Sequence, residues 1–339
     1  MSIQRFITLT KFMKKNRILI TGAAGFVGSH LTEKLLSLGY RINAFDRYNS
    51  KNDFHWLNDL RRENNKNCKF ILGDIRDQDS VLNAMKDCDT VIHLAALIGI
   101  PYSYVSPLAY IKTNLEGTYN ILEGSKLLKL KNIIITSTSE VYGSAQYLPI
   151  DEMHPINSQS PYAASKVAAD QLAMSYYRSF KLPIKIIRPF NIYGPRQSER
   201  AIIPTIINQA LGKNDKIFLG NTNPTRDFNY ISDVVDAFLK VMKNKRSIGH
   251  IINVGSNKKI SIGHLTKEIF RLSKKNKKIK KNNLRKRPKS SEVDNLQCNN
   301  KKIKKLLSWH PKVELIEGLA KTIHWFKKNR SGNNKDYII

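Results

Sequence analysis

Residues 17–31 read Arg17-Ile18-Leu19-Ile20-Thr21-Gly22-Ala23-Ala24-Gly25-Phe26-Val27-Gly28-Ser29-His30-Leu31, an apolar run followed by three spaced glycines and the start of an amphipathic pattern. The pattern predicts a short strand, a tight turn and a helix. Glycines in such a turn let the backbone approach a pyrophosphate, and the N–H groups of the helix amino terminus can then bind the phosphates. The stretch therefore predicts a dinucleotide-binding unit, whose cofactor contacts would be Gly22, Gly25, Phe26, Val27 and Gly28.

A carboxylate follows the next apolar run. Residues 41–45 form a second strand pattern that ends at Asp46, about twenty residues past the glycines. A carboxylate at that place accepts hydrogen bonds from the adenosine ribose hydroxyls and repels a 2′-phosphate, which favours NAD over NADP. The neighbouring Arg47 weakens this argument slightly. The alternative is that Asp46 is an ordinary turn residue after a strand.

Strand and helix patterns alternate from residue 17 to about residue 191. Such alternation predicts an α/β protein with a Rossmann-type doubly wound parallel sheet. Ligands bind such sheets at the carboxyl ends of the strands. His93 lies inside one apolar run and is expected to be a core histidine, because no acid is spaced near it. The further cofactor contacts expected at strand ends, beside the adenine or where small residues leave room, are Asp74, Ile75, Ala95 and Ala96.

The stretch Ile133–Lys166 joins an apolar β run, which ends in Ser-Thr-Ser-Glu at 137–140, to the start of a helix. Tyr162 and Lys166 are four residues apart and would share one helix face. An ammonium beside a phenol favours the phenolate, so we expect a lowered pKa for Tyr162. Thr138 and Glu140 could face this pair across a cleft. Tyr-x-x-x-Lys spacing also occurs by chance on solvated helices.

The formal net charge of +30 is unusual for an otherwise ordinary composition with 41% hydrophobic residues. It could indicate nucleic acid, a membrane surface or an acidic substrate. Many lysines are interleaved with asparagine, as in residues 64–67 and 281–283, which favours lysines dispersed over the surface. The basic run Lys274–Lys289 contains no aromatic residue for base stacking. We therefore expect neither a nucleic-acid nor a membrane partner.

The three cysteines, Cys68, Cys88 and Cys298, are far apart and show no C-x-x-C spacing. They predict neither a metal site nor a disulfide framework, and they favour a reducing, cytoplasmic compartment. No apolar run approaches the length of a membrane span. Residues 1–16 are basic but lack the apolar region and cleavage site of a signal peptide, and Met13 could be the true start.

The regular alternation loosens beyond Gly194, where prolines interrupt the pattern. We expect an NAD-binding Rossmann domain formed by residues 17–193 and 228–255. A smaller mixed C-terminal substrate lobe would comprise residues 194–227 and 256–330 and close over the cleft. Residues 1–16 would form a basic extension and residues 331–339 a tail.

Taken together, these pieces resemble the extended short-chain dehydrogenase/reductases of the NAD-dependent epimerase/dehydratase family, over roughly residues 17–327. Within the family, Ser160-Pro161-Tyr162 and the segments 194–198 and 203–205 are most similar to sugar-nucleotide 4,6-dehydratases of nonulosonic (legionaminic-type) acid pathways. The motifs that carry the family resemblance are Thr21–Gly28, Ser137–Gly143, Tyr162–Lys166, Arg188–Arg196 and Thr225–Phe228.

The resemblance implies that a nucleotide-linked N-acetylglucosamine or hexose becomes a 4-keto-6-deoxy sugar for surface-glycan synthesis. Tyr162 would take the proton of the 4-hydroxyl, Lys166 would hold the nicotinamide ribose, and Glu140 would remove the proton at C5. Thr138 would hydrogen-bond the 4-oxygen. Ser139 stands where glucose-type dehydratases carry an aspartate that protonates the leaving hydroxyl, whereas mannose-type enzymes also have serine. Glu140 or a water could donate that proton here.

The resemblance also assigns the substrate side. Asn191 would bond the phosphate, and Arg226 and Arg287 would clamp the diphosphate and nucleotide. Surface ion pairs are the alternative for each arginine. The resemblance further implies a homodimer formed through a four-helix interface that includes the Tyr162 helix.

Several other functions stay open. A UDP-glucuronate decarboxylase of the same fold shares Thr-Ser-Glu-Val-Tyr-Gly, and a nucleotide-sugar 4-epimerase is second, although epimerases usually lack an acid at the Glu140 position. Two functions of other classes also stay open. One is a redox-silent binding protein, and the other is a basic nucleic-acid-binding protein, which the net charge would suit. The presence of Tyr162, Lys166 and Glu140 favours an enzyme.

Overall fold

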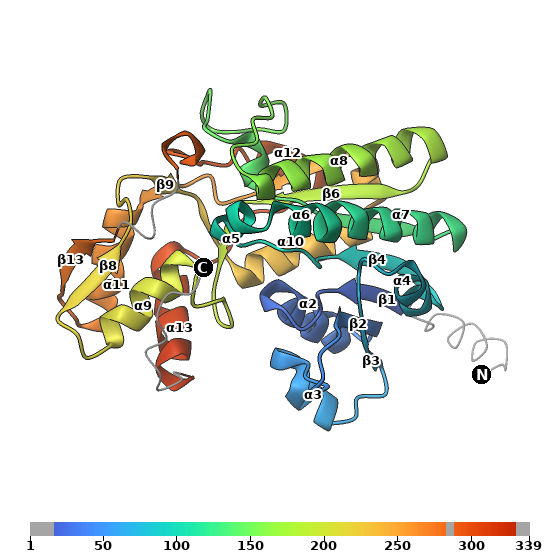
Figure 1. The fold of residues 1–339 in the computed structure, drawn as a ribbon, viewed down its shortest axis with the longest axis horizontal. Coiled ribbons are helices and arrows are strands. Elements are labelled where there is room, and N and C mark those ends of the chain that lie inside the picture. Colours follow the sequence, from blue (N-terminus) through green and yellow to red (C-terminus); the bar gives the residue numbers. More distant parts are fainter. Residues whose placement is uncertain (1–16, 283–287, 330–339) are drawn as a thin grey trace, which may run out of the picture.

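The computed structural model describes residues 17–282 and 288–329 (Figure 1). The expected extension 1–16, the tail 331–339 and the predicted substrate residue Arg287 lie outside the described residues.

A parallel sheet of seven strands forms the centre of the structure, as predicted. Every neighbouring pair of its strands is parallel. The chain leaves β1 toward one edge through β2 and β3, and then crosses back to β4 on the other side of β1. The strand order is β11 (Ile251–Val254), β6 (Ile184–Pro189), β5 (Asn132–Thr136), β4 (Cys88–His93), β1 (Arg17–Thr21), β2 (Arg41–Arg47) and β3 (Cys68–Gly73).

Helices cover both faces of the sheet because the buried strands are apolar on both sides. Along β1, Ile18 and Ile20 pack into one core and Leu19 into the other. The first core also holds side chains of α2 (Phe26–Ser37) and α10 (Ile231–Lys243). The helices that pack into the second core are α4 (Gln78–Met85), α7 (Gly117–Leu127) and α8 (Pro161–Phe180).

The other α-helices of the described residues are either short helices of four to six residues before β5 or helices that follow β7 in the chain. They are α3 (Asn58–Arg62), α5 (Ile100–Val105), α6 (Pro107–Tyr110), α9 (Ile202–Leu211), α11 (Ile262–Ser273), α12 (Lys301–Leu307) and α13 (Leu315–Lys328).

One predicted helix is not continuous. The sequence pattern indicates a single helix from Tyr110 to Leu127, but the structure has α6, a π-helical segment Ile111–Glu116 and then α7. The wider π turn carries Asn114, whose side chain is buried and bonded to other elements. Such tertiary bonds override the local helical pattern.

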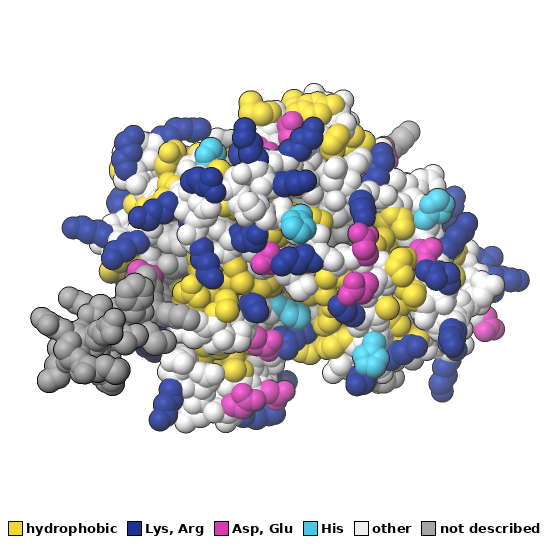
Figure 2. Space-filling model, turned by 180° about the vertical axis from the view of Figure 1, so that it is seen from behind, with side chains coloured by type: hydrophobic (Ala, Val, Ile, Leu, Met, Phe, Trp, Pro, Cys, Tyr) yellow, Lys and Arg dark blue, Asp and Glu magenta, His cyan; other side chains and the backbone are white. Residues whose placement is uncertain are grey.

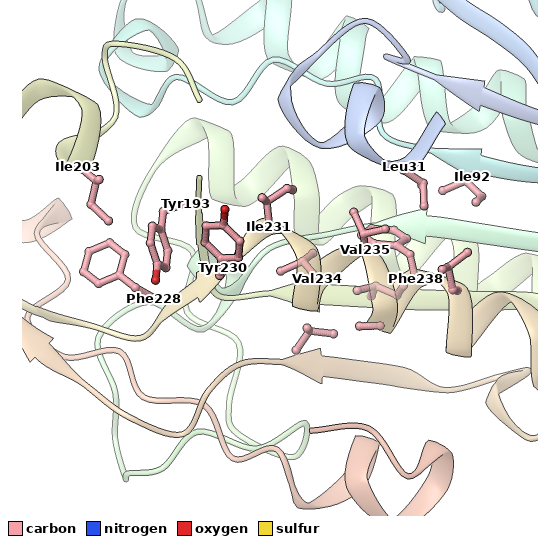
Figure 3. Close-up of a cluster of buried hydrophobic side chains, with 14 of the residues drawn as sticks. Leu31, Ile92, Tyr193, Ile203, Phe228, Tyr230, Ile231, Val234, Val235 and Phe238 are labelled. Atoms are coloured by element: carbon pink, nitrogen blue, oxygen red, sulfur yellow. The ribbon is translucent and has the colours of Figure 1, made fainter. Parts of the chain in front are cut away.

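Three two-stranded sheets, two parallel and one antiparallel, lie outside the central sheet among the described elements that follow β6. They pair β7 (Asn191–Tyr193) with β10 (Phe228–Tyr230), β8 (Lys216–Leu219) with β13 (Lys278–Lys281), and β9 (Thr225–Arg226) with β12 (Ile260–Ser261). Figure 3 shows why this part is firmly attached to the sheet. The rings of Tyr193, Phe228 and Tyr230 lie in one row with Val234 and Phe238 of α10, so a single apolar cluster runs from the sheet into the C-terminal elements.

The surface is basic without one dominant patch on the face that Figure 2 shows. Lys and Arg side chains are spread over that face between apolar and neutral areas, with fewer acidic groups among them. Within residues 17–282 and 288–329, no helix is both long and apolar enough to cross a bilayer. All three cysteines are free thiols.

Candidate functional site

The glycine turn after β1 and the amino terminus of α2 together form a cradle. Glycines are needed there for the turn and for the close packing of the helix. Gly22 has a φ of +69°, which favours glycine. A Cβ at Gly28 would lie 2.1 Å from the carbonyl oxygen of Gly22, so only glycine lets α2 pack this closely. Gly25 is the N-cap of helix α2, which has no side-chain cap and no acidic residue in its first turn. Its amino-terminal N–H groups are therefore suited to an anionic ligand.

Asp46 lies beside this cradle at the end of β2. Its Oδ2 accepts a 2.7 Å hydrogen bond from the Ala24 N–H, and its Oδ1 accepts one of 2.7 Å from the Arg47 N–H. The carboxylate is thus fixed by two backbone groups next to the glycine turn. This is the place that a ribose would occupy if the pyrophosphate lay on α2.

Strands β3 and β4 end at the same edge of the sheet, β3 next to β2 and β4 next to β1. Ile75 is buried against Gly117, and its carbonyl accepts a 3.0 Å bond from Asn120. Asp74 is paired with Arg76, and this guanidinium holds the pKa of the carboxyl below its usual range. The half-buried Ala95 and Ala96 follow β4.

His93 is a satisfied core histidine, as predicted. Its Nδ1 lies 2.8 Å from the Thr21 hydroxyl and its Nε2 lies 3.2 Å from the Thr118 hydroxyl. Since Thr118 donates its own proton to the Asn114 carbonyl, the bond to Thr118 requires a proton on Nε2. Burial and the nearby Lys166 lower the pKa of His93 to about 3, so the ring is neutral at physiological pH.

Tyr162 and Lys166 occupy one face of α8, and both are buried. Ser160 caps the helix by accepting a 3.1 Å bond from the Ala163 N–H, and Pro161 occupies its first turn. These residues start the helix so that Tyr162 lies at its amino end, toward the carboxyl ends of the strands. The Tyr162 ring makes an edge contact with Tyr110 at 6.2 Å.

The residues after β5 meet Tyr162. The Thr138 side chain hydrogen-bonds the Tyr162 phenol, and the Thr138 hydroxyl also accepts a 3.2 Å bond from the Glu140 N–H. Ser139 is buried, and Glu140 is half-buried and close enough for its charge to act on Tyr162. The structure therefore brings together Thr138, Ser139, Glu140, Tyr162 and Lys166.

The electrostatics of the pair differ from the prediction for Tyr162. Burial raises the pKa of Tyr162, and the hydrogen bond from Thr138 offsets this only in part. The expected lowered pKa is therefore wrong for the protein without a ligand, because desolvation of the phenolate outweighs stabilising contacts. Burial also lowers the pKa of Lys166 to about 8, and Asp170 opposes that shift.

On the substrate side, Asn191 lies on β7, and its Oδ1 is buried without a hydrogen-bond partner in the described part of the chain. Arg226 is buried on β9. Its guanidinium donates to the Thr225 carbonyl at 2.9 Å and lies 3.5 Å from a carboxylate oxygen of Glu292. The ion pair to Glu292 was not anticipated from the sequence.

Sequence reasoning also missed the supports of α8. Asn114 donates to the Ser165 hydroxyl at 2.9 Å and accepts from the Leu97 N–H at 2.8 Å, which ties the π segment to α8. Asp170 forms a buried ion pair with Arg188. The one available signal was the spacing of Asp170, four residues after Lys166.

Comparisons with known proteins agree with this geometry. Residues 19–322 match the family described as GDP-mannose 4,6 dehydratase. The chain is 35% identical over 326 residues to the dTDP-D-glucose 4,6-dehydratase of Bos taurus, covering 92% of this chain and 89% of the relative. It is likewise 35% identical over 326 residues to a UDP-N-acetyl-alpha-D-glucosaminuronate decarboxylase of Bacillus cytotoxicus, covering 93% and 98% of the two chains.

A solved structure of a third kind is also similar. The UDP-glucuronic acid 4-epimerase of Bacillus cereus, in complex with UDP-glucuronic acid and NAD, superposes with a TM-score of 0.84 at 31% identity, over 92% of this chain and 99% of the epimerase. The chain thus belongs to the GDP-mannose 4,6-dehydratase family, one of the NAD-dependent nucleotide-sugar dehydratase and epimerase families of the short-chain dehydrogenase/reductases.

Proposed function

We propose that the protein is an NAD-dependent nucleotide-sugar 4,6-dehydratase, which converts a nucleotide-linked N-acetylglucosamine or hexose into a 4-keto-6-deoxy sugar. The observation that carries this proposal is the position of Glu140. The negative charge of its carboxylate is close enough to raise the pKa of the buried Tyr162, and Thr138 hydrogen-bonds the same phenol. An acid at this place supplies a second base, which elimination needs and simple oxidation at C4 does not.

The residues around the glycine turn fit NAD. Gly22 and Gly28 allow the turn and the close packing of α2, whose amino-terminal N–H groups would bind the pyrophosphate, and Asp46 is fixed where a ribose would lie. Lys166 would hold the nicotinamide ribose, with Ala95 and Ala96 leaving space at the end of β4. The chemistry that NAD would supply when bound is hydride transfer, away from C4 of the sugar and back to C6.

The side chains of this protein would supply the proton transfers. Tyr162 would accept the proton of the 4-hydroxyl. Because burial raises the pKa of Tyr162, the phenolate that this requires would depend on cationic groups such as the Lys166 ammonium, one turn away. Thr138 would hydrogen-bond the 4-oxygen. The ketone at C4 acidifies the hydrogen at C5, which Glu140 would remove as a proton.

The leaving 6-hydroxyl needs a proton to depart as water. Ser139 has no acidic proton to give at neutral pH, so Glu140, once it has taken the proton from C5, is the best-placed donor. In that case one carboxylate would serve first as base and then as acid. When hydride returns to C6, C5 takes up a proton again, and the proton that Tyr162 accepted from the 4-hydroxyl balances it, so no net proton would be consumed.

The nucleotide sugar would lie across the C-terminal elements. The Asn191 side-chain NH₂ and the buried guanidinium of Arg226 are donors suited to a sugar diphosphate. Asn191 Oδ1, which has no hydrogen-bond partner among the described residues, could accept from a sugar hydroxyl. Arg287 would add a second guanidinium. We place the product in surface-glycan synthesis of the nonulosonic-acid type, a proposal that rests on the resemblance alone.

The ion pair of Arg226 bears on how selective this binding would be. A diphosphate bound to Arg226 has to compete with Glu292 for the guanidinium. A diphosphate carries more charge than one carboxylate, so the exchange favours the ligand while discriminating against weaker anions.

A decarboxylase is the second candidate, because a relative of equal identity is named as one. Oxidation at C4 of a uronate makes a β-keto acid, which loses carbon dioxide without a base at C5. Glu140 would then have no proton to remove, so this alternative explains the carboxylate less well.

A product assay tests the reaction. We expect UDP-, GDP- or dTDP-linked N-acetylglucosamine or glucose to yield a 4-keto-6-deoxy sugar without net production of NADH, because the hydride is returned. In deuterated water the product should carry deuterium at C5, measured by mass spectrometry. Release of carbon dioxide from a nucleotide-linked uronate, with no dehydration of any neutral sugar, would instead identify a decarboxylase.

Replacing Glu140 tests its role as the base. Glu140→Gln should lower kcat for dehydration by about 10²- to 10⁴-fold, because general base catalysis contributes that much, while NAD binding stays unchanged. The matched control is Glu63→Gln, which alters an exposed glutamate at the end of α3 and should leave kcat unaffected. A Glu140→Gln enzyme with normal turnover would remove this residue from the mechanism.

Replacing Asp46 tests the cofactor site. Asp46→Asn should weaken NAD binding about tenfold or more and reduce the preference for NAD over NADP, because hydrogen bonds to a charged group contribute about 1.5–3 kcal/mol. Titration calorimetry with both dinucleotides measures this. Asp59→Asn, which changes an exposed aspartate paired with Arg62, is the control and should bind both as the parent does. Equal NAD affinity in the two variants would place the ribose elsewhere.

We also propose a homodimer formed through α7 and α8. These neighbouring helices expose Tyr119, Leu127 and Phe180, by 43%, 58% and 50% respectively. A second copy could cover them in an isologous helix pairing. Light scattering should therefore give twice the chain mass. Leu127→Glu should shift the protein toward monomer, whereas Ile279→Glu on β13 should not; a monomeric parent protein would contradict the proposal.

A further inference from the structure

Asp170 is a buried carboxylate that the proposed chemistry leaves unexplained. It is 1% exposed and lies on α8 one turn beyond Lys166, so Tyr162, Lys166 and Asp170 follow one stripe of the helix. Its Oδ2 accepts a 2.7 Å bond from the Ser137 hydroxyl and a 3.0 Å bond from Arg188 Nε, and a second guanidinium nitrogen lies 2.9 Å away.

The second oxygen of the Asp170 carboxylate, Oδ1, differs from Oδ2 in its hydrogen bonding. Asp170 Oδ1 is buried and has no hydrogen-bond partner in the described part of the chain. A buried carboxylate oxygen without a donor is costly, and such groups usually have a reason in function. A simple structural ion pair with Arg188 would not require a second oxygen to be left without a donor.

The charged groups nearby are few. Besides its pair with Asp170, Arg188 donates to the Tyr142 hydroxyl at 3.0 Å, and its guanidinium lies 5.0 Å from the centroid of that ring. The neutral His93 faces Lys166 from β4.

The groups that face Tyr162 are equally limited. They are Thr138, Glu140 and Tyr110, together with Asp170 from its own helix. Asp170 is thus a negative charge that acts on both Tyr162 and Lys166.

We propose that Asp170 is a positioning residue: its buried negative charge, one turn beyond Lys166 on the same helix face, stabilises the charged form of Lys166 and sets the pH range over which the Tyr162–Lys166 pair works. This inference rests on the proposed function for its meaning in catalysis. The electrostatic part concerns the chain alone.

The direction of the effect follows from Coulomb's law. Burial disfavours the ammonium, and Asp170 raises the pKa of Lys166 against that effect. The same charge raises the pKa of Tyr162. Removing it makes both protons easier to lose, so both pKa values should fall together. A residue that only supports the fold would change the rate without moving both limits.

The test uses Asp170→Asn in the full chain. Both limbs of the pH profile of kcat/KM should move to lower pH by about one unit, which is the small end of shifts caused by a nearby opposite charge. Independently of activity, the pH at which Lys166 becomes reactive to acetic anhydride, read by peptide mass spectrometry, should fall as well. If the parent enzyme dehydrates no nucleotide sugar, the proposed function fails while the labelling still tests Asp170.

Matched variants separate charge from support. Asp170→Glu keeps the charge and should restore both limbs, and Ser137→Ala removes a hydrogen bond to the same carboxylate but should move neither. If Asp170→Asn does not fold because Arg188 is left unpaired, the double variant Asp170→Asn with Arg188→Gln removes both charges and should show a smaller shift in the same direction. The inference would be overturned if a folded Asp170→Asn variant, or the folded double variant, kept both limbs of its pH profile and the labelling midpoint of Lys166 at the pH values of the parent.

Discussion

The parallel alignment of β1, β4 and β5 is the constraint on which the site depends. Since all three strands run the same way, the glycine turn, the small residues after β4 and the hydroxyls after β5 emerge at one edge of the sheet. The crossover from β3 back to β4 opens that edge beside β1, which is where ligands bind doubly wound sheets. Helix α8 then returns from the same edge, so Tyr162 begins the helix close to Thr138 and Glu140.

This convergence places polar groups where burial makes them costly. Lys166, Asp170, Arg188 and His93 are all nearly inaccessible to solvent. A buried charge is tolerated when it is paired or hydrogen-bonded, and His93 instead stays neutral between two threonines. The shifts at Tyr162 and Lys166 therefore have one origin, which is the removal of water from the end of α8. Any change that admits water there would weaken the electrostatics on which the proposed proton transfer depends.

Much of this arrangement could be predicted because it is local. The glycine turn, Asp46 and the Tyr162–Lys166 pair are each encoded within a few residues, and their spacing alone indicates how they lie. The π segment around Asn114 and the ion pair between Arg226 and Glu292 could not be predicted, because both are set by contacts between elements distant in sequence. The raised pKa of Tyr162 was missed for a related reason: spacing shows that an ammonium is near, but the extent of burial appears only when the fold is complete.

The relatives of this chain are named for three different reactions, and oxidation of a hexose at C4 is a step from which each of the three can start. Oxidation at C4 of a hexose makes the hydrogen at C5 acidic, makes a carboxylate at C5 labile, and makes the configuration at C4 reversible. In the proposed function, the Tyr162–Lys166 pair would provide only that step. The second step depends on whether a base stands beside C5 and on which sugar the C-terminal elements admit. In the function proposed for this chain, the base is Glu140, whose backbone N–H donates to the Thr138 hydroxyl that also hydrogen-bonds the buried phenol of Tyr162. With a base at that place, elimination is the branch that the proposal assigns.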